Sequence, residues 1–187
     1  MKKRWVLLLA VILGIVFLWT QVLSPIKASV GKVECISWDA TYVGIEAQAK
    51  EYKKGSLPKD TVAYAFTGEL PSKNPEDYMT VYCNFETQNT SILERYTVNA
   101  TLKDAKKYGE RILFVSDANA TVIPIADRMD KADGNIILDL YIKDMSEAEI
   151  EELVRGLELT VKAYGKHFGT EEKTLSYKNC EDITIEF

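Results

Sequence analysis

The sequence contains a single histidine, His167, among its 187 residues, and this scarcity limits the chemistry that the chain can perform. A metal site built from several histidines is excluded within one chain. The motifs G-x-S-x-G and H-E-x-x-H, typical of serine hydrolases and zinc proteases, are also absent. His167 lies in a predicted turn at 166–169, where we expect an exposed residue and not a general base. We therefore expect no catalytic residue, no cofactor and no metal ion.

No acidic residue occurs before Glu34. The chain has 23 basic and 28 acidic residues, and three of the basic ones are Lys2, Lys3 and Arg4. The remainder therefore holds 20 basic and 28 acidic residues, a net charge of −8. Because nucleic acids are bound through excess positive charge, we expect no nucleic-acid partner.

Charged and polar side chains are also lacking from Trp5 to Trp19, directly after the basic start. This order is typical of a secretory signal or a signal anchor. Fifteen helical residues cover roughly 22 Å, and extension to about Leu23 brings the helix close to the roughly 30 Å of a hydrocarbon core. We expect the helix to end near Ser24-Pro25, because proline disfavours helix in the residue before it. No small-x-small cleavage site follows, which favours an uncleaved transmembrane anchor over a cleaved signal peptide.

These features predict four segments: a cytoplasmic basic start at 1–4, a transmembrane signal anchor or signal peptide at 5–24, a linker at 25–30 and an extracytoplasmic domain at 31–187. The expected location is the cell membrane, crossed once with the C-terminal domain outside, or secretion if the leader is cleaved. The membrane is thus an expected partner through the N-terminal helix.

Apolar and polar side chains alternate along many segments of the domain, which predicts strands with one buried and one wet face. Turn-forming residues separate the segments, and about eight short strands with frequent turns indicate an all-β sandwich. The alternation is clear at 79–85, 96–102, 136–143, 157–164 and 183–187, and further strands are expected at 32–40, 61–67, 111–115 and 120–126.

One short helix is predicted between two of these strands. Ser146 is a suitable N-cap, and Glu149 three residues later completes a capping box. Ile150 and Val154 supply apolar positions, and Gly156 supplies the stop. Glu147 and Glu151 lie on one exposed face of this helix, so we interpret them as capping and solubilising charges and not as a hydrolytic pair.

The order of strand, helix, strand, turn at 166–169 and strand resembles the end of an immunoglobulin-like sandwich. The segments Tyr78–Phe85 and Tyr96–Leu102, joined by a polar turn at 89–91, likewise look like two sandwich strands. With its basic and apolar start, the chain resembles the uncharacterised membrane-anchored ectodomains of bacteria. The resemblance implies an immunoglobulin-like β-sandwich with one short helix behind an N-terminal transmembrane helix, and it transfers no functional residue.

The three cysteines are Cys35, Cys83 and Cys180, an odd number that leaves at least one unpaired within the chain. Cys83 alternates with apolar residues and is expected to be buried as a small hydrophobe. Cys35 belongs to the first predicted strand and Cys180 lies near the last. First and last strands are neighbours in many sandwiches, so we predict a Cys35–Cys180 disulfide.

Asp127, Asp130, Asp133 and Gly134 form a cluster that could suggest a calcium site. Calcium loops place ligands at every second residue and close with a glutamate, whereas these aspartates are three apart. A polar loop that turns at Asp133-Gly134 is the better interpretation.

Tyrosines at Tyr82, Tyr141 and Tyr164 fall on the wet side of the predicted strands and form a candidate binding surface. Our first hypothesis is a non-enzymatic protein-interaction module that recognises another protein of the cell envelope. The second is a carbohydrate- or small-ligand-binding domain, and an enzyme that uses carboxylates ranks lowest. A flat exposed apolar patch would favour the first hypothesis, and a groove lined by tyrosines would favour the second.

Overall fold

The computed structural model describes residues 2–19, 26–91, 93–116, 123–125, 131–167 and 169–187. Its α-helices are α1 (Lys2–Leu18), α2 (Asp39–Lys54) and α3 (Glu147–Arg155). Its strands are β1 (Ile26–Ile36), β2 (Thr61–Ala63), β3 (Tyr78–Asn89), β4 (Tyr96–Leu102), β5 (Ile112–Ser116), β6 (Ile123–Ile125), β7 (Lys131–Tyr141), β8 (Glu158–Gly165), β9 (Gly169–Ser176) and β10 (Ile183–Glu186).

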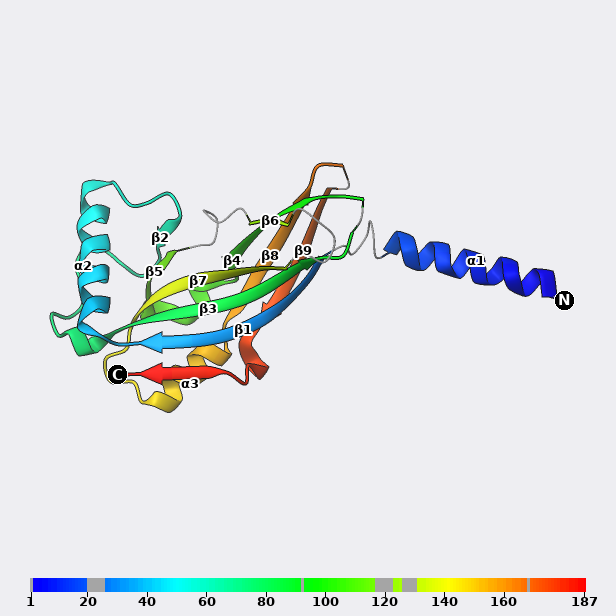
Figure 1. Cartoon of the computed structure of the whole chain (residues 1–187). Coiled ribbons are helices and arrows are strands. Elements are labelled where there is room, and N and C mark those ends of the chain that lie inside the picture. The colour runs from blue at the N-terminus through cyan, green and yellow to red at the C-terminus, as the bar shows by residue number, and fades with distance from the viewer. Residues whose placement is uncertain (1, 20–25, 92, 117–122, 126–130, 168) are drawn as a thin grey trace.

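The strands form two sheets (Figure 1), and one apolar core includes residues of both. The larger sheet has the order β10-β1-β3-β7-β5-β2 and the smaller sheet the order β6-β4-β8-β9. Alternation along β3 directs Val81 and Cys83 inward, where they join Leu138 of β7 with Val98 and Val161 of the smaller sheet. All five are at most 2% exposed. The sandwich expected from the alternation is therefore confirmed in its coarse form.

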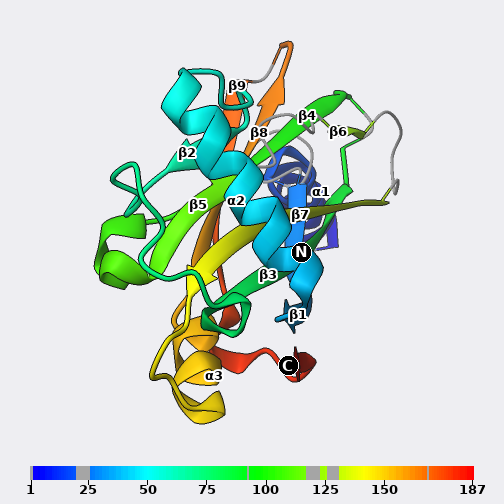
Figure 2. The same cartoon turned by 90° about the vertical axis from the view of Figure 1, so that its left-hand side faces the viewer.

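Helix α2 forms a third layer on the outer face of the larger sheet (Figure 2). Its buried residues are Ile45 and Ala49, and they belong to a second apolar cluster with Phe66, Tyr78 and Phe114. A bulge in β5 makes this cluster possible, because the register shifts between residues 112 and 114. Leu113 and Phe114 thereby both join the cluster beneath α2.

The predicted all-β, immunoglobulin-like arrangement with one short helix is wrong, because α2 is a second helix of 16 residues in the domain. The strand expected at 32–40 ends at Ile36, and α2 begins at Asp39. The helix shows only a narrow apolar stripe and includes Thr41, Val43 and Gly44, which have low helix propensity. One sequence signal was present: Gly55 directly follows two lysines and adopts the left-handed conformation of a helix C-cap, with φ of 71°.

The predicted transmembrane helix is also not supported. Helix α1 has 17 residues, and at 1.5 Å per residue it is about 26 Å long, below the roughly 30 Å of a hydrocarbon core. No helix in the described part of the chain is both long enough and apolar enough to cross a membrane. Residues 20–25, over which the helix was expected to continue and end, lie outside the described residues.

Other expectations hold. Strands β4, β8 and β10 occupy the segments predicted at 96–102, 157–164 and 183–187. Helix α3 begins after Ser146, whose side chain accepts a hydrogen bond from the Glu149 backbone N–H, as the capping box predicted. The first and last strands are neighbours, since β1 and β10 pair in parallel.

Candidate functional site

A groove of about 370 Å³ lies between the first half of α2 and the outer face of the larger sheet. The helix contributes one wall, and β3 and β7 contribute the floor. We call it the Asp139 groove, after the one charged side chain among the described residues that line it. The lining residues are Ile36, Trp38, Ala40, Thr41, Gly44, Ile45, Gln48, Thr80, Tyr82, Ser116, Ile137 and Asp139.

Asp139 is a carboxylate buried in the floor, with only 4% of its surface exposed. Thr80 Oγ1 of β3 donates a hydrogen bond to Asp139 Oδ1 over 2.7 Å. Gln48 Nε2 of α2 donates to Asp139 Oδ2 over 2.9 Å. Burial raises the pKa of Asp139 to about 6, and the two hydrogen bonds oppose that rise. The carboxyl group is thus mostly ionised at neutral pH.

Gln48 has an acceptor that no described group satisfies. Its Nε2 is used by Asp139, and its Oε1 is buried without a hydrogen-bond partner. Leaving such an acceptor unmatched costs about 1–3 kcal/mol, so buried polar atoms in folded proteins are usually paired. The groove therefore contains two buried acceptors, the carboxylate and this amide oxygen, that can receive further donors.

Aromatic side chains flank these acceptors. Trp38 lies at the start of α2 as its N-cap residue and is 53% exposed. Tyr82 lies on β3, two residues after Thr80, and is partly buried on the same face of the sheet. Pockets for small ligands commonly combine apolar or aromatic walls with a few polar groups, which is the composition found here.

The three tyrosines of the predicted binding surface do not gather in one place. Tyr82 lines the Asp139 groove. Tyr141 packs against Tyr78 at 5.6 Å between ring centroids and belongs to the cluster beneath α2. Tyr164 lies on β8 in the other sheet and is 43% exposed. Sequence alternation identified one groove residue, Tyr82, and missed Gln48 and Asp139, because α2 was not predicted.

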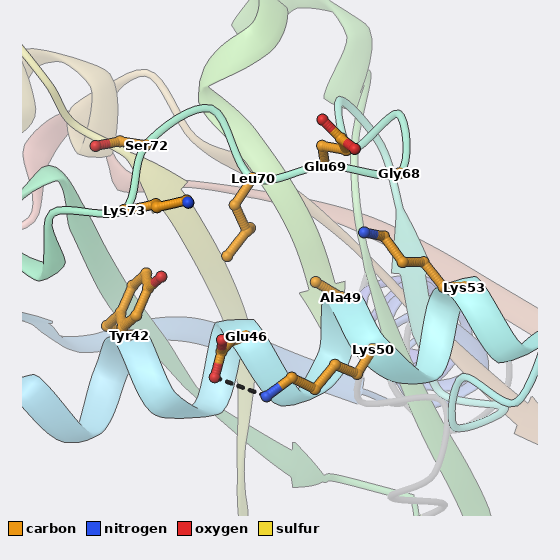
Figure 3. Close-up of a pocket in the computed structure, with 10 residues that line it drawn as sticks. All are labelled: Tyr42, Glu46, Ala49, Lys50, Lys53, Gly68, Glu69, Leu70, Ser72 and Lys73. Carbon is orange, nitrogen blue, oxygen red and sulfur yellow. Dashed lines mark hydrogen bonds and ion pairs between the residues drawn. The ribbon is translucent and has the colours of Figure 1, made fainter.

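A second cavity, of about 380 Å³, lies on the opposite flank of α2 (Figure 3). Lys50, Lys53 and Lys73 line it together with Glu46 and Glu69, and Lys50 Nζ is 2.8 Å from Glu46 Oε2. Among all its lining residues only Ala49 is buried. Since the charged groups there are solvated and of both signs, this cavity, the lysine cleft, is the weaker candidate.

His167 lies between β8 and β9, with 64% of its side chain exposed, as the sequence predicted. Its Nδ1 is 3.1 Å from Glu94 Oε2, and its backbone N–H donates to the same oxygen over 2.6 Å. Burial of Glu94 opposes ionisation, yet hydrogen bonds from the backbone N–H groups of His167 and Arg95 leave its pKa below the ordinary value. The pair fixes the loop before β4 to the β8–β9 hairpin.

All three cysteines are buried and free in the structure, so the predicted Cys35–Cys180 disulfide is not formed. The register explains why. Cys35 lies opposite Ile185 of β10, whereas Cys180 precedes that strand and its thiol donates to the Gly31 carbonyl over 3.4 Å. Burial raises the pKa of Cys35 to about 12 and raises that of Cys83 further.

No group of three or more histidine, cysteine or acidic residues suited to a metal ion occurs in the described parts of the chain. Of the residues considered for calcium, Asp127 and Asp130 lie outside the described residues. Asp133 and Gly134 belong to β7, where they pair with Glu86 and Phe85 of β3. The turn predicted at Asp133-Gly134 is therefore replaced by strand.

Comparisons with protein-family models, with curated proteins and with solved structures found no match for this chain.

Proposed function

We propose that the domain is a non-enzymatic binding module and that the Asp139 groove receives a small ligand rich in hydrogen-bond donors, of the carbohydrate class. One observation carries the proposal: two buried acceptors, the Asp139 carboxylate and Gln48 Oε1, lie in one cavity with acceptor capacity left over. A sugar supplies hydroxyl donors for such acceptors and an apolar ring face for Trp38 or Tyr82. This favours the small-ligand hypothesis over the protein-interaction hypothesis.

The lining supports binding without catalysis. Glycoside hydrolases generally place two carboxyl groups on either side of the bond that they cleave. In the described part of the chain, the residues that line the Asp139 groove include one carboxyl group and no histidine, cysteine or lysine. We therefore propose recognition, and not hydrolysis, as the role of Asp139.

We further propose that the module acts outside the cytoplasm. The support is the order of residues 2–19, in which a basic start precedes an apolar run, as in export signals. Fusion of alkaline phosphatase, which is active only after export, to the C-terminus tests this. We expect an active fusion from the complete chain and an inactive one after deletion of residues 2–19, and equal activity of the two fusions would refute export by this segment.

Tryptophan fluorescence offers a direct test of ligand binding. The chain has three tryptophans, so the double variant Trp5→Phe/Trp19→Phe leaves Trp38 at the groove as the single indole. The purified full chain, in a detergent without a sugar headgroup, is titrated with glucose, galactose, N-acetylglucosamine and their β-1,4-linked disaccharides. We expect a saturable fluorescence change with at least one of these sugars.

Matched tyrosine variants locate the site. Tyr82→Ala in the single-tryptophan chain should weaken binding by about tenfold or more, as expected for loss of a central aromatic contact. Tyr164→Ala removes an exposed tyrosine from the other sheet and should leave the affinity unchanged. Absence of a saturable change with every sugar, or equal effects of the two variants, would refute the proposal.

A protein-interaction module is the second candidate, and one observation favours it. Trp38, the N-cap residue of α2, and Val43, in the first part of the helix, are 53% and 62% exposed, and exposed aromatic side chains often anchor protein interfaces. Val43 does not line the Asp139 groove. Val43→Lys should therefore leave sugar binding intact and abolish binding of an envelope protein captured through this surface.

A further inference from the structure

The charge of the Asp139 groove indicates which charge the ligand carries, and this inference rests on the function proposed above. Among the described residues that line the groove, Asp139 is the only one that is charged at neutral pH. None of the ion pairs between described residues includes it, and its hydrogen-bond donors, Thr80 and Gln48, are both neutral. The floor of the groove thus presents a buried negative charge without a described countercharge.

Buried charges in folded proteins are normally paired, because removing an ion from water is costly. An ionised carboxylate has about four acceptor sites, and the described donors to Asp139 occupy two of them. The buried Oε1 of Gln48 adds an acceptor on the same floor. A cationic donor would neutralise the carboxylate and also donate hydrogen bonds to the unfilled acceptors, whereas a neutral hydroxyl group would only donate a hydrogen bond.

The walls favour a cation as well. Trp38 and Tyr82 are the two aromatic residues of the lining, and indole and phenol faces attract ammonium groups. Lys50, Lys53 and Lys73 lie on the other flank of α2, in the lysine cleft of Figure 3, and none of them lines the Asp139 groove. The lysine cleft thus combines basic and acidic side chains, whereas the described lining of the Asp139 groove carries a negative charge alone.

We infer that the ligand of the Asp139 groove carries a protonated amine, whose ammonium group binds the Asp139 carboxylate and donates to Gln48 Oε1. An alkylammonium group has three N–H donors, enough for both acceptors. A divalent metal ion fits less well, because calcium takes six to eight oxygen ligands and the lining offers one carboxylate. An amino sugar combines this ammonium group with the hydroxyl groups of the proposed ligand class.

Pairs of probes that differ only in charge test the inference. The full-length Trp5→Phe/Trp19→Phe chain is titrated near neutral pH with glucosamine against glucose, and with cyclohexylamine against cyclohexanol. We expect each amine to bind at least about tenfold more tightly than its neutral counterpart, which corresponds to the lower end of the coupling energies measured for close charge pairs. Asp139→Asn should remove that preference, and Asp144→Asn, an exposed aspartate outside the groove, should retain it.

The outcomes separate this inference from the proposed function. Equal binding of amine and neutral probes, with loss of both in Tyr82→Ala, would refute the amine and leave the binding module standing. Failure of all probes to bind would refute both. An amine preference that persists in Asp139→Asn would also refute the inference, since the carboxylate would then not be its cause.

A third pair of probes distinguishes a free amine from a lysine side chain of a partner protein. Nα-acetyl-lysine amide and its norleucine counterpart differ in the terminal ammonium group. Preference for the lysine derivative over glucosamine would assign the ammonium to a protein partner, and the reverse would assign it to a small molecule. Should Asp139→Asn not fold, the unmodified residue still gives a readout: the amine preference should fall as the pH is lowered through about 6, where Asp139 becomes protonated.

Discussion

Gln48 of α2 and Asp139 of β7 are separated by 91 residues in sequence, and Gln48 Nε2 donates a hydrogen bond to Asp139 Oδ2 over 2.9 Å. This bond joins the outer helix to the central part of the larger sheet, beside the apolar contacts of Ile45 and Ala49. It also fixes the amide so that its oxygen remains without a partner inside the groove. The same contact therefore holds the helix in place and leaves a buried acceptor for the ligand that we propose.

Replacement of Asp139 by Asn should change how stability depends on pH. The ordinary pKa of 3.8 rises to about 6 in the fold, so between about pH 4 and 6 the folded state retains a proton that the unfolded chain has lost. Stability of the wild-type chain should therefore fall as pH rises through this window. Because a pKa difference of one corresponds to about 1.36 kcal/mol, the free energy of unfolding should fall by an amount on the order of 3 kcal/mol.

Asp139→Asn should abolish this loss and raise the free energy of unfolding at neutral pH, since its amide can also donate to Gln48 Oε1. Urea unfolding of the ligand-free chain at a series of pH values measures the effect. Asp144→Asn, in an exposed loop, should keep the wild-type profile. An unchanged profile in Asp139→Asn would show that another group titrates.

Two glycine-to-alanine substitutions should act in opposite directions. A Cβ added at Gly134 of β7 would lie 2.5 Å from Cζ of Phe85, which is 2% exposed, so Gly134→Ala should destabilise by about 1–3 kcal/mol through overpacking. At Gly44, inside α2, an added Cβ meets nothing within 4 Å. Gly44→Ala should therefore stabilise by about 0.5–1 kcal/mol.

Urea or thermal unfolding of Gly134→Ala and Gly44→Ala measures the change in the free energy of unfolding that each substitution causes. Phe85→Leu should cost less stability in the Gly134→Ala background than in the wild type, because it removes the ring that the new methyl group contacts. Equal stability of Gly134→Ala and the wild type would mean that the β3–β7 pair adjusts more freely than its close packing suggests.

The thiols should be unreactive until the chain unfolds. Cys35, Cys83 and Cys180 are buried, and burial raises the pKa of Cys35 to about 12, which suppresses the reactive thiolate. Ellman's reagent should react slowly with the native chain and should titrate three thiols per chain in denaturant without reductant. A single thiol in denaturant would instead indicate that a disulfide, such as Cys35–Cys180, had formed.

Removal of the α3 cap should weaken the structure locally. Ser146 Oγ accepts from the Glu149 backbone N–H over 3.3 Å, and Glu149 Oε2 accepts from the Ser146 backbone N–H over 2.7 Å. Ser146→Ala should lower the free energy of unfolding by about 1 kcal/mol, whereas Ser146→Asp should retain most of it, because aspartate is an equally good N-cap. Chemical denaturation of the two variants side by side decides whether the cap contributes as expected.

Local patterns determined much of the sandwich. Alternation predicted the strand at 96–102, which is β4. The capping box from Ser146 to Glu149 predicted the start of α3, since a cap depends on residues within one turn. Helix α2 could not be found in the same way, because its stability comes from the contacts of Ile45 and Ala49 with residues far along the chain.

The Asp139 groove forms only in the tertiary structure, and the sequence pattern did not predict it. Along β7 the alternation correctly separates Leu138, in the core, from Asp139 on the opposite face, which the pattern predicts to be wet. Asp139 is nevertheless only 4% exposed, because α2 and its Gln48 cover that face. A period of two assigns each residue to a face of its sheet, but it contains no information about what packs on that face. The sequence thus determined on which face of the sheet the carboxylate lies, and only the fold determined that it is buried without a charged partner among the described residues.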